Sequence, residues 1–356
     1  MSHSNATTSS QTLSLRPSPE RSRAALVVDR YELFDVLGVG GSAVVHIGRL
    51  RATGGFVRTV AIKRLKTELE YDAEARESLL EEARVLGRIS SPHVVAAIDV
   101  VRRRQGDPFL VMEYIEGETL ARLLRASAAD RVPIAIAIAI AIDALRGLHA
   151  AHEAKDARGG NLDVTHADIS PENLMVGADG LTRVCDFGIT RARHVELAVE
   201  AAVGVRGKLP YLAPEQLIGE RPDRRSDVYA VSVVLWEMLV GRLLFDAVDA
   251  AENVTRILGG TVVPPRMLVG GVGYEVESAV LRGLARHPRD RFETAAAMAR
   301  ALAAASRAAS VSDVAAWVRR TVPVGLARRA AAVRRMERED EDEAACSPSA
   351  TDVSSS

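Results

Sequence analysis

The sequence predicts an α+β protein of two unequal lobes, in which a small β-rich lobe precedes a larger helical lobe. Two observations predict this division. Between Tyr31 and Tyr114, short β-rich pieces with glycine-containing turns follow one another and are interrupted by a single helical stretch. After Gly117 the pattern becomes mostly helical.

The first lobe is expected to hold a five-stranded sheet and one helix. Its strand-like pieces are residues 31–37, 44–50, 57–64, 94–101 and 109–114. The helix is expected from about Ala73 to Ile89, because Leu79, Ala83 and Leu86 fall on one side of it at helical spacing.

The segment from Ile134 to Ile142 alternates Ile and Ala, which strict counting would assign to a strand. However, Ile134, Ile138, Ile142 and Leu145 also form a stripe at helical spacing, and no turn signal interrupts the run before Leu148. We therefore expect a helix in this segment.

Composition limits the possible functions. A hydrophobic content of 47% is enough for a sizeable core, and a net charge of −1 provides no basic field for a nucleic-acid partner. Cys185 and Cys346 are far apart in the sequence, which fits a reducing cytoplasm better than a disulfide framework. The apolar run at 134–142 is about half the ~20 residues that a spanning helix needs, so no membrane span is expected.

Both ends of the chain are expected to lie outside the two lobes. Residues 1–29 are rich in Ser, Thr, Pro and Arg and predict a disordered leader. Residues 306–356 are expected to hold a helical stretch around Trp317, an Arg-rich segment, and an acidic, Ser-rich disordered tail. The N-terminal lobe would then span 30–115 and the C-terminal lobe 116–305.

A glycine-rich segment between the first two strands indicates a phosphate-binding loop, because glycines let backbone N–H groups approach phosphate oxygens. It reads Leu37-Gly38-Val39-Gly40-Gly41-Ser42-Ala43-Val44-Val45. Such a loop is a weak signal alone, and its context strengthens it. Lys63 on the next strand could hold the α- and β-phosphates if a carboxylate of the following helix, Glu81 or Glu82, orients it.

Two later motifs supply the groups that phosphoryl transfer requires. They are His166-Ala167-Asp168-Ile169-Ser170-Pro171-Glu172-Asn173 and Asp186-Phe187-Gly188. A carboxylate must orient the attacking hydroxyl, and Asp168 suits this role. Oxygen ligands must hold Mg²⁺, and Asn173 and Asp186 suit that role. The order of the motifs along one chain argues against a chance occurrence.

Over roughly residues 30–305 the sequence resembles the Hanks-type (eukaryotic-like) serine/threonine protein kinases, in a soluble bacterial form. The resemblance implies the bilobal protein-kinase fold, with ATP and Mg²⁺ between the lobes and a protein substrate on the helical lobe. It implies that Lys63 pairs with Glu82. It also implies a nucleotide pocket formed by the glycine-rich loop with Val45, Ala61, the gatekeeper Met112, the hinge residues Glu113 and Ile115, and Met175. Cys185, just before Asp186, would line the same pocket, or would be only a small buried apolar residue, as free cysteines often are.

The resemblance also implies three structural residues. Glu215 of the Ala213-Pro214-Glu215 motif would pair with a buried Arg291, and Asp227 would brace the catalytic loop. A small-molecule kinase of the aminoglycoside or choline type shares the His-x-Asp and Mg²⁺ chemistry. Such an enzyme would not be expected to show Tyr211 to Glu215 followed by Asp227 in this arrangement.

The sequence departs from the family pattern at several positions. Ala43 stands where the third glycine is usual, and Thr119 stands where many relatives carry an acid for the ribose. Ala167 replaces an arginine that binds an activation-segment phosphate in relatives, and residues 189–212 contain Thr190 as their single Ser or Thr. We therefore predict that activity does not depend on phosphorylation of this segment.

Ser170 replaces the lysine that commonly contacts the γ-phosphate, whereas Lys208 occupies a position usually filled by a threonine. One hypothesis is that Lys208 supplies the missing cation, and the alternative is that Lys208 is only a solvent-exposed side chain.

Specificity for Ser and Thr hydroxyls is favoured over specificity for Tyr, because the loop that carries Asp168 lacks the Ala-Ala-Arg pattern typical of tyrosine kinases. A pseudokinase that binds nucleotide as a scaffold is the competing function, supported by the departures at Ala43, Ala167 and Ser170.

Overall fold

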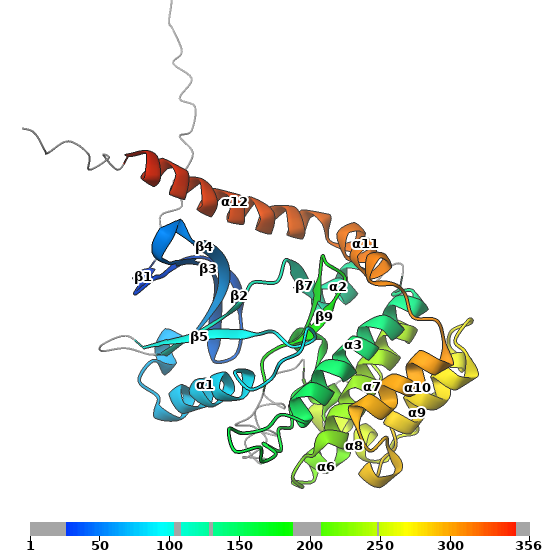
Figure 1. Ribbon diagram of the computed structural model, residues 1–356. Coiled ribbons are helices and arrows are strands. Elements are labelled where there is room, and N and C mark those ends of the chain that lie inside the picture. Colours follow the sequence, from blue (N-terminus) through cyan, green and yellow to red (C-terminus); the bar gives the residue numbers. More distant parts are fainter. Residues whose placement is uncertain (1–25, 103–107, 128–130, 188–207, 248, 347–356) are drawn as a thin grey trace, which may run out of the picture.

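The computed structural model describes residues 26–102, 108–127, 131–187, 208–247 and 249–346, and these form two lobes (Figure 1). The smaller lobe contains one sheet with strand order β1-β2-β3-β4-β6-β5, in which neighbouring strands are antiparallel. Helix α1 packs against this sheet. The elements are β1 Leu26–Val28, β2 Tyr31–Val39, β3 Ala43–Arg51, β4 Val57–Leu65, α1 Ala73–Leu86, β5 Ala97–Arg102 and β6 Pro108–Glu113.

The sheet has six strands rather than the five expected, because β1 adds to its edge. Val28 pairs with Tyr31 across a tight turn in which Asp29 adopts a left-handed conformation, with φ 55°. A strand of three residues is too short to show an alternating pattern in the sequence. The expected leader, 1–29, thus overlaps the sheet by its last residues, and 1–25 lie outside the described residues.

Alternation along β4 decides what faces the cleft between the lobes. Val60 and Ile62 point to one side of the sheet and are fully buried there, so Ala61 and Lys63 point to the other side. Helix α1 begins at the N-cap Asp72, whose side chain accepts a hydrogen bond from the Ala75 N–H at 2.8 Å. It ends three residues earlier than expected, before Gly87.

The larger lobe is mainly helical and carries a small three-stranded sheet, β7-β8-β9, on the side of the first lobe. Its strands are β7 Gly117–Thr119, β8 Leu174–Gly177 and β9 Thr182–Val184. Its helices are α2 Leu120–Ala126, α3 Ile134–His152, α6 Pro214–Leu217, α7 Arg224–Val240, α8 Ala250–Gly259, α9 Tyr274–Gly283 and α10 Ala295–Ala305. Short 3-10 turns include η3 Pro171–Asn173 and η4 Leu209–Tyr211.

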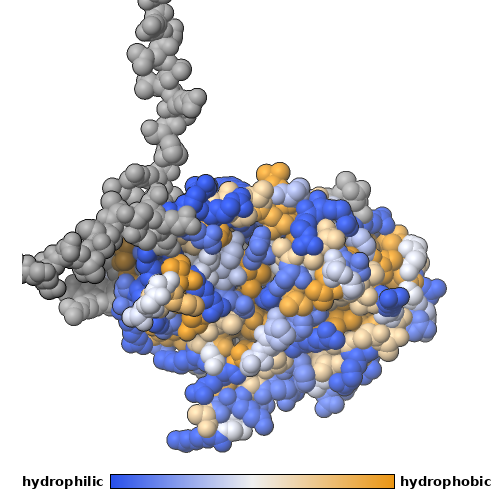
Figure 2. Space-filling model, turned by 45° about the horizontal axis from the view of Figure 1, so that its top comes forward, coloured by the Kyte–Doolittle hydropathy of each residue, from blue (hydrophilic) through white to orange (hydrophobic). Residues whose placement is uncertain are grey.

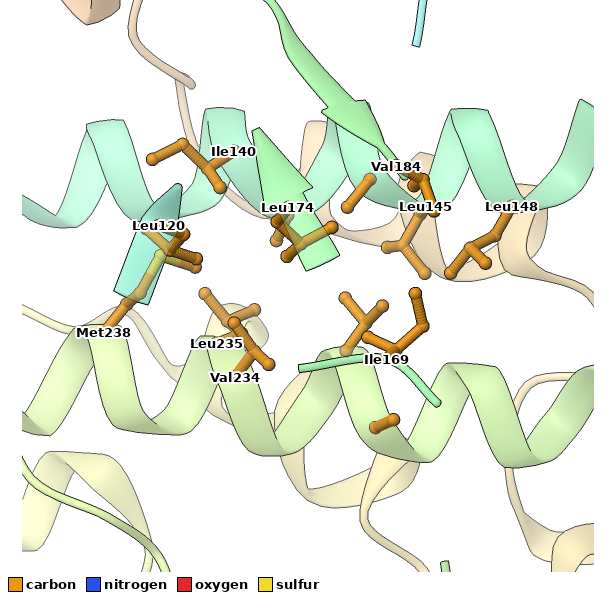
Figure 3. Packing of buried hydrophobic residues seen from close by; sticks show 14 of the residues in the cluster. Leu120, Ile140, Leu145, Leu148, Ile169, Leu174, Val184, Val234, Leu235 and Met238 are labelled. Atoms are coloured by element: carbon orange, nitrogen blue, oxygen red, sulfur yellow. The ribbon is translucent and has the colours of Figure 1, made fainter. Parts of the chain in front are cut away.

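The core of this lobe lies between α3 and α7, with β8 and β9 inserted beside them (Figure 3). Ile140 and Leu145 of α3 face Leu235 and Met238 of α7 across this layer, and Leu174 of β8 fills the space between the helices. All five side chains are at most 1% exposed. This packing fixes the catalytic loop, which joins α3 to β8.

The Ile-Ala segment is helical, as expected, and belongs to α3. Its residues from Ile136 to Ile142 are all buried, so no polar face is needed and helical periodicity is weak in the sequence. At 19 residues, α3 is long and apolar enough to span a membrane, unlike the shorter run counted in the sequence. However, 61% of its apolar window is buried inside the protein, as in a core helix.

The C-terminal part forms two helices, α11 Val311–Thr321 and α12 Pro323–Cys346. The acidic residues expected to lie in a disordered tail, 337–343, belong to α12. In Figure 1, α12 extends from α11 across the strands of the smaller lobe. The face shown in Figure 2 is largely hydrophilic, with apolar side chains in scattered patches.

Candidate active site

Three elements bring together Lys63, Glu82 and Asp186. Lys63 lies on β4, Glu82 on the buried side of α1, and Asp186 two residues after the end of β9 in the other lobe. The Lys63 Nζ donates hydrogen bonds to both Glu82 oxygens, at 2.9 and 2.7 Å, and to Asp186 Oδ1 at 2.8 Å. The expected Lys63–Glu82 pairing is therefore present in the structure, and Lys63 also joins the two lobes.

Two carboxylates share one ammonium in this cluster, which leaves an excess negative charge. Burial alone would lower the pKa of Lys63, but the attraction of Asp186 and Glu82 raises it above its ordinary value. Lys63 holds the pKa of Asp186 below its ordinary value, although burial opposes the shift. Burial raises the pKa of Glu82; Lys63 opposes this shift and Asp186 reinforces it. Asp186 is 45% exposed at its side chain, so a cation arriving in the cleft can reach it.

The catalytic-loop residue Ala167 adopts a left-handed backbone, with φ 59°, and two side chains hold it there. Asp227 of α7 accepts hydrogen bonds from the backbone N–H groups of His166, at 2.9 Å, and Ala167, at 2.8 Å. Gln216 Nε2 donates to the Ala167 carbonyl at 3.0 Å. Because this conformation costs a non-glycine residue about 1–2 kcal/mol, these contacts compensate for strain.

Asp227 has a further buried partner that no sequence motif indicates. The His152 Nε2 lies 2.7 Å from Asp227 Oδ2, and both side chains are 1% exposed. Gln216, which holds Ala167, was also missed in the sequence. The only available signal for these residues was position, since His152 ends α3 and Gln216 follows Glu215.

Asp168 contacts both an amide and a cation. Asn173 Nδ2 donates a hydrogen bond to the backbone carbonyl of Asp168 at 2.7 Å. The same nitrogen lies 3.4 Å from the side-chain Oδ2 of Asp168. Lys208 Nζ contacts the same Oδ2 at 2.5 Å. The Lys208 side chain is 15% exposed, in contrast to the solvent-exposed alternative considered for it.

His166 connects the catalytic loop to the segment that carries Asp186. Its ring lies 4.7 Å from the Phe187 ring, and its Nε2 is 3.1 Å from the Cys185 carbonyl. Burial lowers the pKa of His166, although Asp227 and Asp168 oppose the shift. Burial also raises the pKa of the Cys185 thiol well above its ordinary value, with a contribution from Asp186.

The glycine-rich segment joins β2 to β3 through a tight turn, in which the Gly40 N–H donates to the Ala43 carbonyl at 2.8 Å. A Cβ atom at Gly38 or Gly41 would meet no other atom within 4 Å, so the space beside the loop is open. Ala43 pairs with Leu65 on β4 and is 5% exposed. Its backbone φ is not positive, which is why alanine is tolerated where the third glycine is usual.

The residues predicted to surround adenine come from both lobes. Val45 of β3, Ala61 of β4 and Met112 of β6 share one face of the sheet. From the other side, Met175 lies on β8 and Cys185 directly follows β9. The backbone N–H of the hinge residue Glu113 donates a hydrogen bond to the Ala96 carbonyl, at 3.0 Å. Ile115 follows in the hinge and packs against the main core.

The Ala213-Pro214-Glu215 motif is fixed by a buried ion pair. Arg291 donates to both Glu215 oxygens, at 2.6 and 2.7 Å, and is 2% exposed. Ser226 Oγ donates to Glu215 Oε1 at 2.6 Å. The implied partnership of Glu215 and Arg291 is therefore present. Gly188 and Thr190, by contrast, lie outside the described residues.

Comparison with known proteins agrees with this architecture. Residues 31–280, which are more than half of the chain, match the family described as the protein kinase domain. The chain belongs to the protein kinase family. The bacterial kinases to which it is similar support its placement among the Hanks-type protein kinases.

The chain is similar to two differently named bacterial kinases. It is 36% identical over 274 residues to the tyrosine-protein kinase MasK of Myxococcus xanthus. It is 33% identical over 274 residues to the serine/threonine-protein kinase PknB of Mycobacterium leprae. Each match covers 76% of this chain but 42% of the relative, so the chain spans less than half the length of these relatives.

A solved structure supports the fold. The PknI kinase domain of Mycobacterium tuberculosis matches with a TM-score of 0.58 at 21% sequence identity. The match covers 80% of this chain and 98% of that domain. The bilobal protein-kinase fold predicted from the sequence is thereby confirmed.

Proposed function

We propose that this protein is an ATP- and Mg²⁺-dependent protein kinase that transfers the γ-phosphoryl group of ATP to Ser or Thr hydroxyls of proteins. The observation that carries the proposal is the contact of Lys63 with both Glu82 and Asp186, with Lys208 close enough for its charge to act on Asp186 while it contacts Asp168. These groups come from separate parts of the chain and have the chemistry that phosphoryl transfer requires.

The residues fit the two ligands that the proposal requires. Lys63, held by Glu82, would contact the α- and β-phosphates beneath the glycine-rich loop. The excess negative charge around Asp186 favours a cation, and Asn173, whose amide nitrogen is engaged with Asp168, would add its oxygen as a ligand. When bound, Mg²⁺ supplies charge neutralisation between the β- and γ-phosphates. Asp168 would orient the hydroxyl and accept its proton.

Lys208 is proposed to supply the cation that Ser170 cannot. Ser170 is 1% exposed and its hydroxyl has no hydrogen-bond partner, so it lies buried rather than aimed at substrate. The ammonium of Lys208 lies instead beside Asp168, where the transferred group must pass. A positive charge at this point would stabilise negative charge that develops in the transition state.

We further propose that activity needs no phosphate on the activation segment. Ala167 carries no charge, is 7% exposed, and is surrounded by Asp227 and Gln216. It therefore offers no group that could pair with a phosphate.

The few cysteines of the chain suit a reducing compartment, and we propose a cytoplasmic location for this domain.

The first test is incorporation of labelled γ-phosphate by the purified protein with ATP and Mg²⁺, alone and with a generic protein substrate. We expect labelling that disappears in the Asp168→Asn variant and after chelation of Mg²⁺. Because the relatives carry both tyrosine and serine/threonine in their names, hydrolysis of the labelled protein is part of the test. Phosphoserine or phosphothreonine is expected, and phosphotyrosine alone would contradict the proposed specificity.

A pseudokinase is the second candidate, favoured by the buried Ser170 and the uncharged Ala167. It predicts that ATP raises the melting temperature while no phosphate is transferred to any substrate. Absence of both labelling and nucleotide binding would overturn the assignment of the cleft itself.

A further inference from the structure

The C-terminal helices contact both lobes, although they lie beyond the matched kinase domain, which ends at residue 280. Helix α11 belongs to the larger lobe. Val314, Trp317 and Val318 are at most 5% exposed within its main core, and Arg319 donates to the Ala178 carbonyl at 2.8 Å. The start of α12 is therefore held by the larger lobe.

The middle of α12 is tied to the end of the hinge. Arg329 donates to the Gly117 carbonyl and to Glu118 Oε1, the latter at 2.8 Å. Both side chains of this ion pair are largely buried, with 15% exposure for Arg329 and 5% for Glu118. Between this contact and α11, the helix leaves a cavity of about 580 Å³ behind hinge residues Glu113 to Glu116.

The next turns of α12 pack onto the strands of the smaller lobe. The Met336 side chain is 1% exposed and forms a buried cluster with Phe34 of β2 and Ile47 of β3. The Met336 carbonyl accepts a hydrogen bond from Arg49 at 2.6 Å. Arg335 adds a more exposed ion pair with Asp35 at 3.0 Å. If α12 contacted the smaller lobe only through polar surface residues, the Met336 side chain would stay exposed. Its burial shows that α12 packs against the apolar side chains of this lobe.

This cluster adjoins the proposed nucleotide pocket. Ile47 lies two residues beyond Val45 on β3, so both side chains fall on the same face of the sheet. Leu37, at the entrance to the glycine-rich loop, packs against both the Met336 cluster and the main core. The hinge residue Tyr114 packs against the Met336 cluster as well. Met336 therefore contacts both the glycine-rich strands and the hinge, beside the proposed pocket.

We propose that α12 is a positioning element for nucleotide binding, which fixes the glycine-rich strands and the hinge relative to the larger lobe through Met336 and Arg329. The inference rests on the proposed binding of ATP in the cleft. Release of Met336 frees β2 and β3 from α12, so the loop spends less time in the conformation that closes over phosphates. ATP affinity then falls, while the chemistry at Asp168 is unchanged once ATP is bound.

The test compares the full-length protein with the Met336→Glu variant, which places a charge in the buried cluster. Val324→Glu is the matched control, because Val324 lies on the same helix and is 81% exposed. Arg329→Gln is a second variant that removes the ion pair with Glu118 and introduces no new charge; the Glu118 carboxylate keeps its contact with Arg122 at 3.4 Å. The measurements are the Kd for ATP with Mg²⁺, KM for ATP and kcat, and amide hydrogen exchange of residues 31–47 and 113–117.

We expect about tenfold weaker ATP binding and a matching rise in KM for Met336→Glu, within the usual range of coupling between sites. Arg329→Gln should show the same change to a smaller extent, and kcat at saturating ATP should stay near that of Val324→Glu. Amides of 31–47 should exchange faster, while those of α3 and α7 should not. A merely structural role would instead change exchange throughout the protein.

Equal ATP affinity and equal exchange in Met336→Glu and Val324→Glu would overturn the inference and leave the proposed kinase function intact. If the unaltered protein bound no ATP, the proposed function would fail instead. In that case faster exchange of β2 and β3 in Met336→Glu would still support the positioning role of α12, and unchanged exchange would reject it.

Discussion

The role proposed for Lys208 depends on where its ammonium lies, which is beside Asp168. In the family pattern the cation lies on the catalytic loop, where this chain has a buried serine. Lys208 comes from the segment before η4 and reaches Asp168 from the other side. The position of the ammonium, rather than its place in the sequence, determines whether it can stabilise a transferring phosphoryl group.

Replacement of this cation should reduce turnover. We expect Lys208→Ala to lower kcat by roughly 10²-fold, the usual effect of losing one transition-state donor, with a smaller change in KM for ATP. Lys208→Arg should keep part of kcat, because it retains a positive charge beside Asp168. Steady-state kinetics of the two variants test this. Unchanged kcat in Lys208→Ala would exclude the proposed role.

At the scale of elements, close backbone contacts position the C-terminal helices. The turn between β8 and β9 meets the start of α11 at Gly180, which has φ 86°. A Cβ atom on Gly180 would lie 1.9 Å from the Val311 carbonyl oxygen, so the turn and α11 can meet only if this residue is glycine. The contact sets the direction in which α11, and α12 after it, leaves the larger lobe.

Replacement of Gly180 should therefore lower the free energy of unfolding. Gly159→Ala is the matched control, because Gly159 also has positive φ, 84°, but open space around its Cβ position. We expect Gly159→Ala to lower the free energy of unfolding by about 1 kcal/mol, from backbone conformation alone. Gly180→Ala should lower it by roughly 3 kcal/mol, because the clash adds to the same strain. Equilibrium urea denaturation measures both, and equal losses would contradict the close contact.

At the scale of the whole molecule, two lobes are held together by contacts of different kinds. Lys63 of the smaller lobe bridges them through its contact with Asp186, and α12 bridges them behind the hinge. Buried polar groups at the junction make the stability of the whole protein depend on pH. His166 is the central example, since it is fully buried beside Phe187.

Stability should fall as the pH drops below about 6.5, the ordinary pKa of histidine. Burial lowers the pKa of His166 from this value, so the unfolded chain takes up a proton that the folded protein does not. Each such group contributes a loss of up to about 1.4 kcal/mol per pH unit until the folded pKa is reached. His149 shifts in the same direction. The melting temperature between pH 7.5 and 5 should decline less steeply in His166→Phe, and parallel curves would contradict this explanation.

How much of the protein could be predicted from its sequence depended on how local each signal was. The glycine-rich loop and the catalytic-loop motif are contiguous, so their spacing identified them. The helix at 134–142 was predicted from its stripe, whereas β1 was missed because three residues carry no pattern. Gln216 and His152 were missed because their roles depend on contacts with Ala167 and Asp227, far away in the sequence.

The sequence by itself determined the fold class, the order of the elements and the chemical types of the cleft residues. These follow from periodicity and spacing, which are properties of neighbouring residues. Only the tertiary structure decided that Lys208 lies beside Asp168, and that α12 buries Met336 against Phe34 and Ile47. Both contacts join segments that are far apart in the sequence. The packing of the helices and strands between them decides whether they meet in space, and no local sequence pattern predicts this.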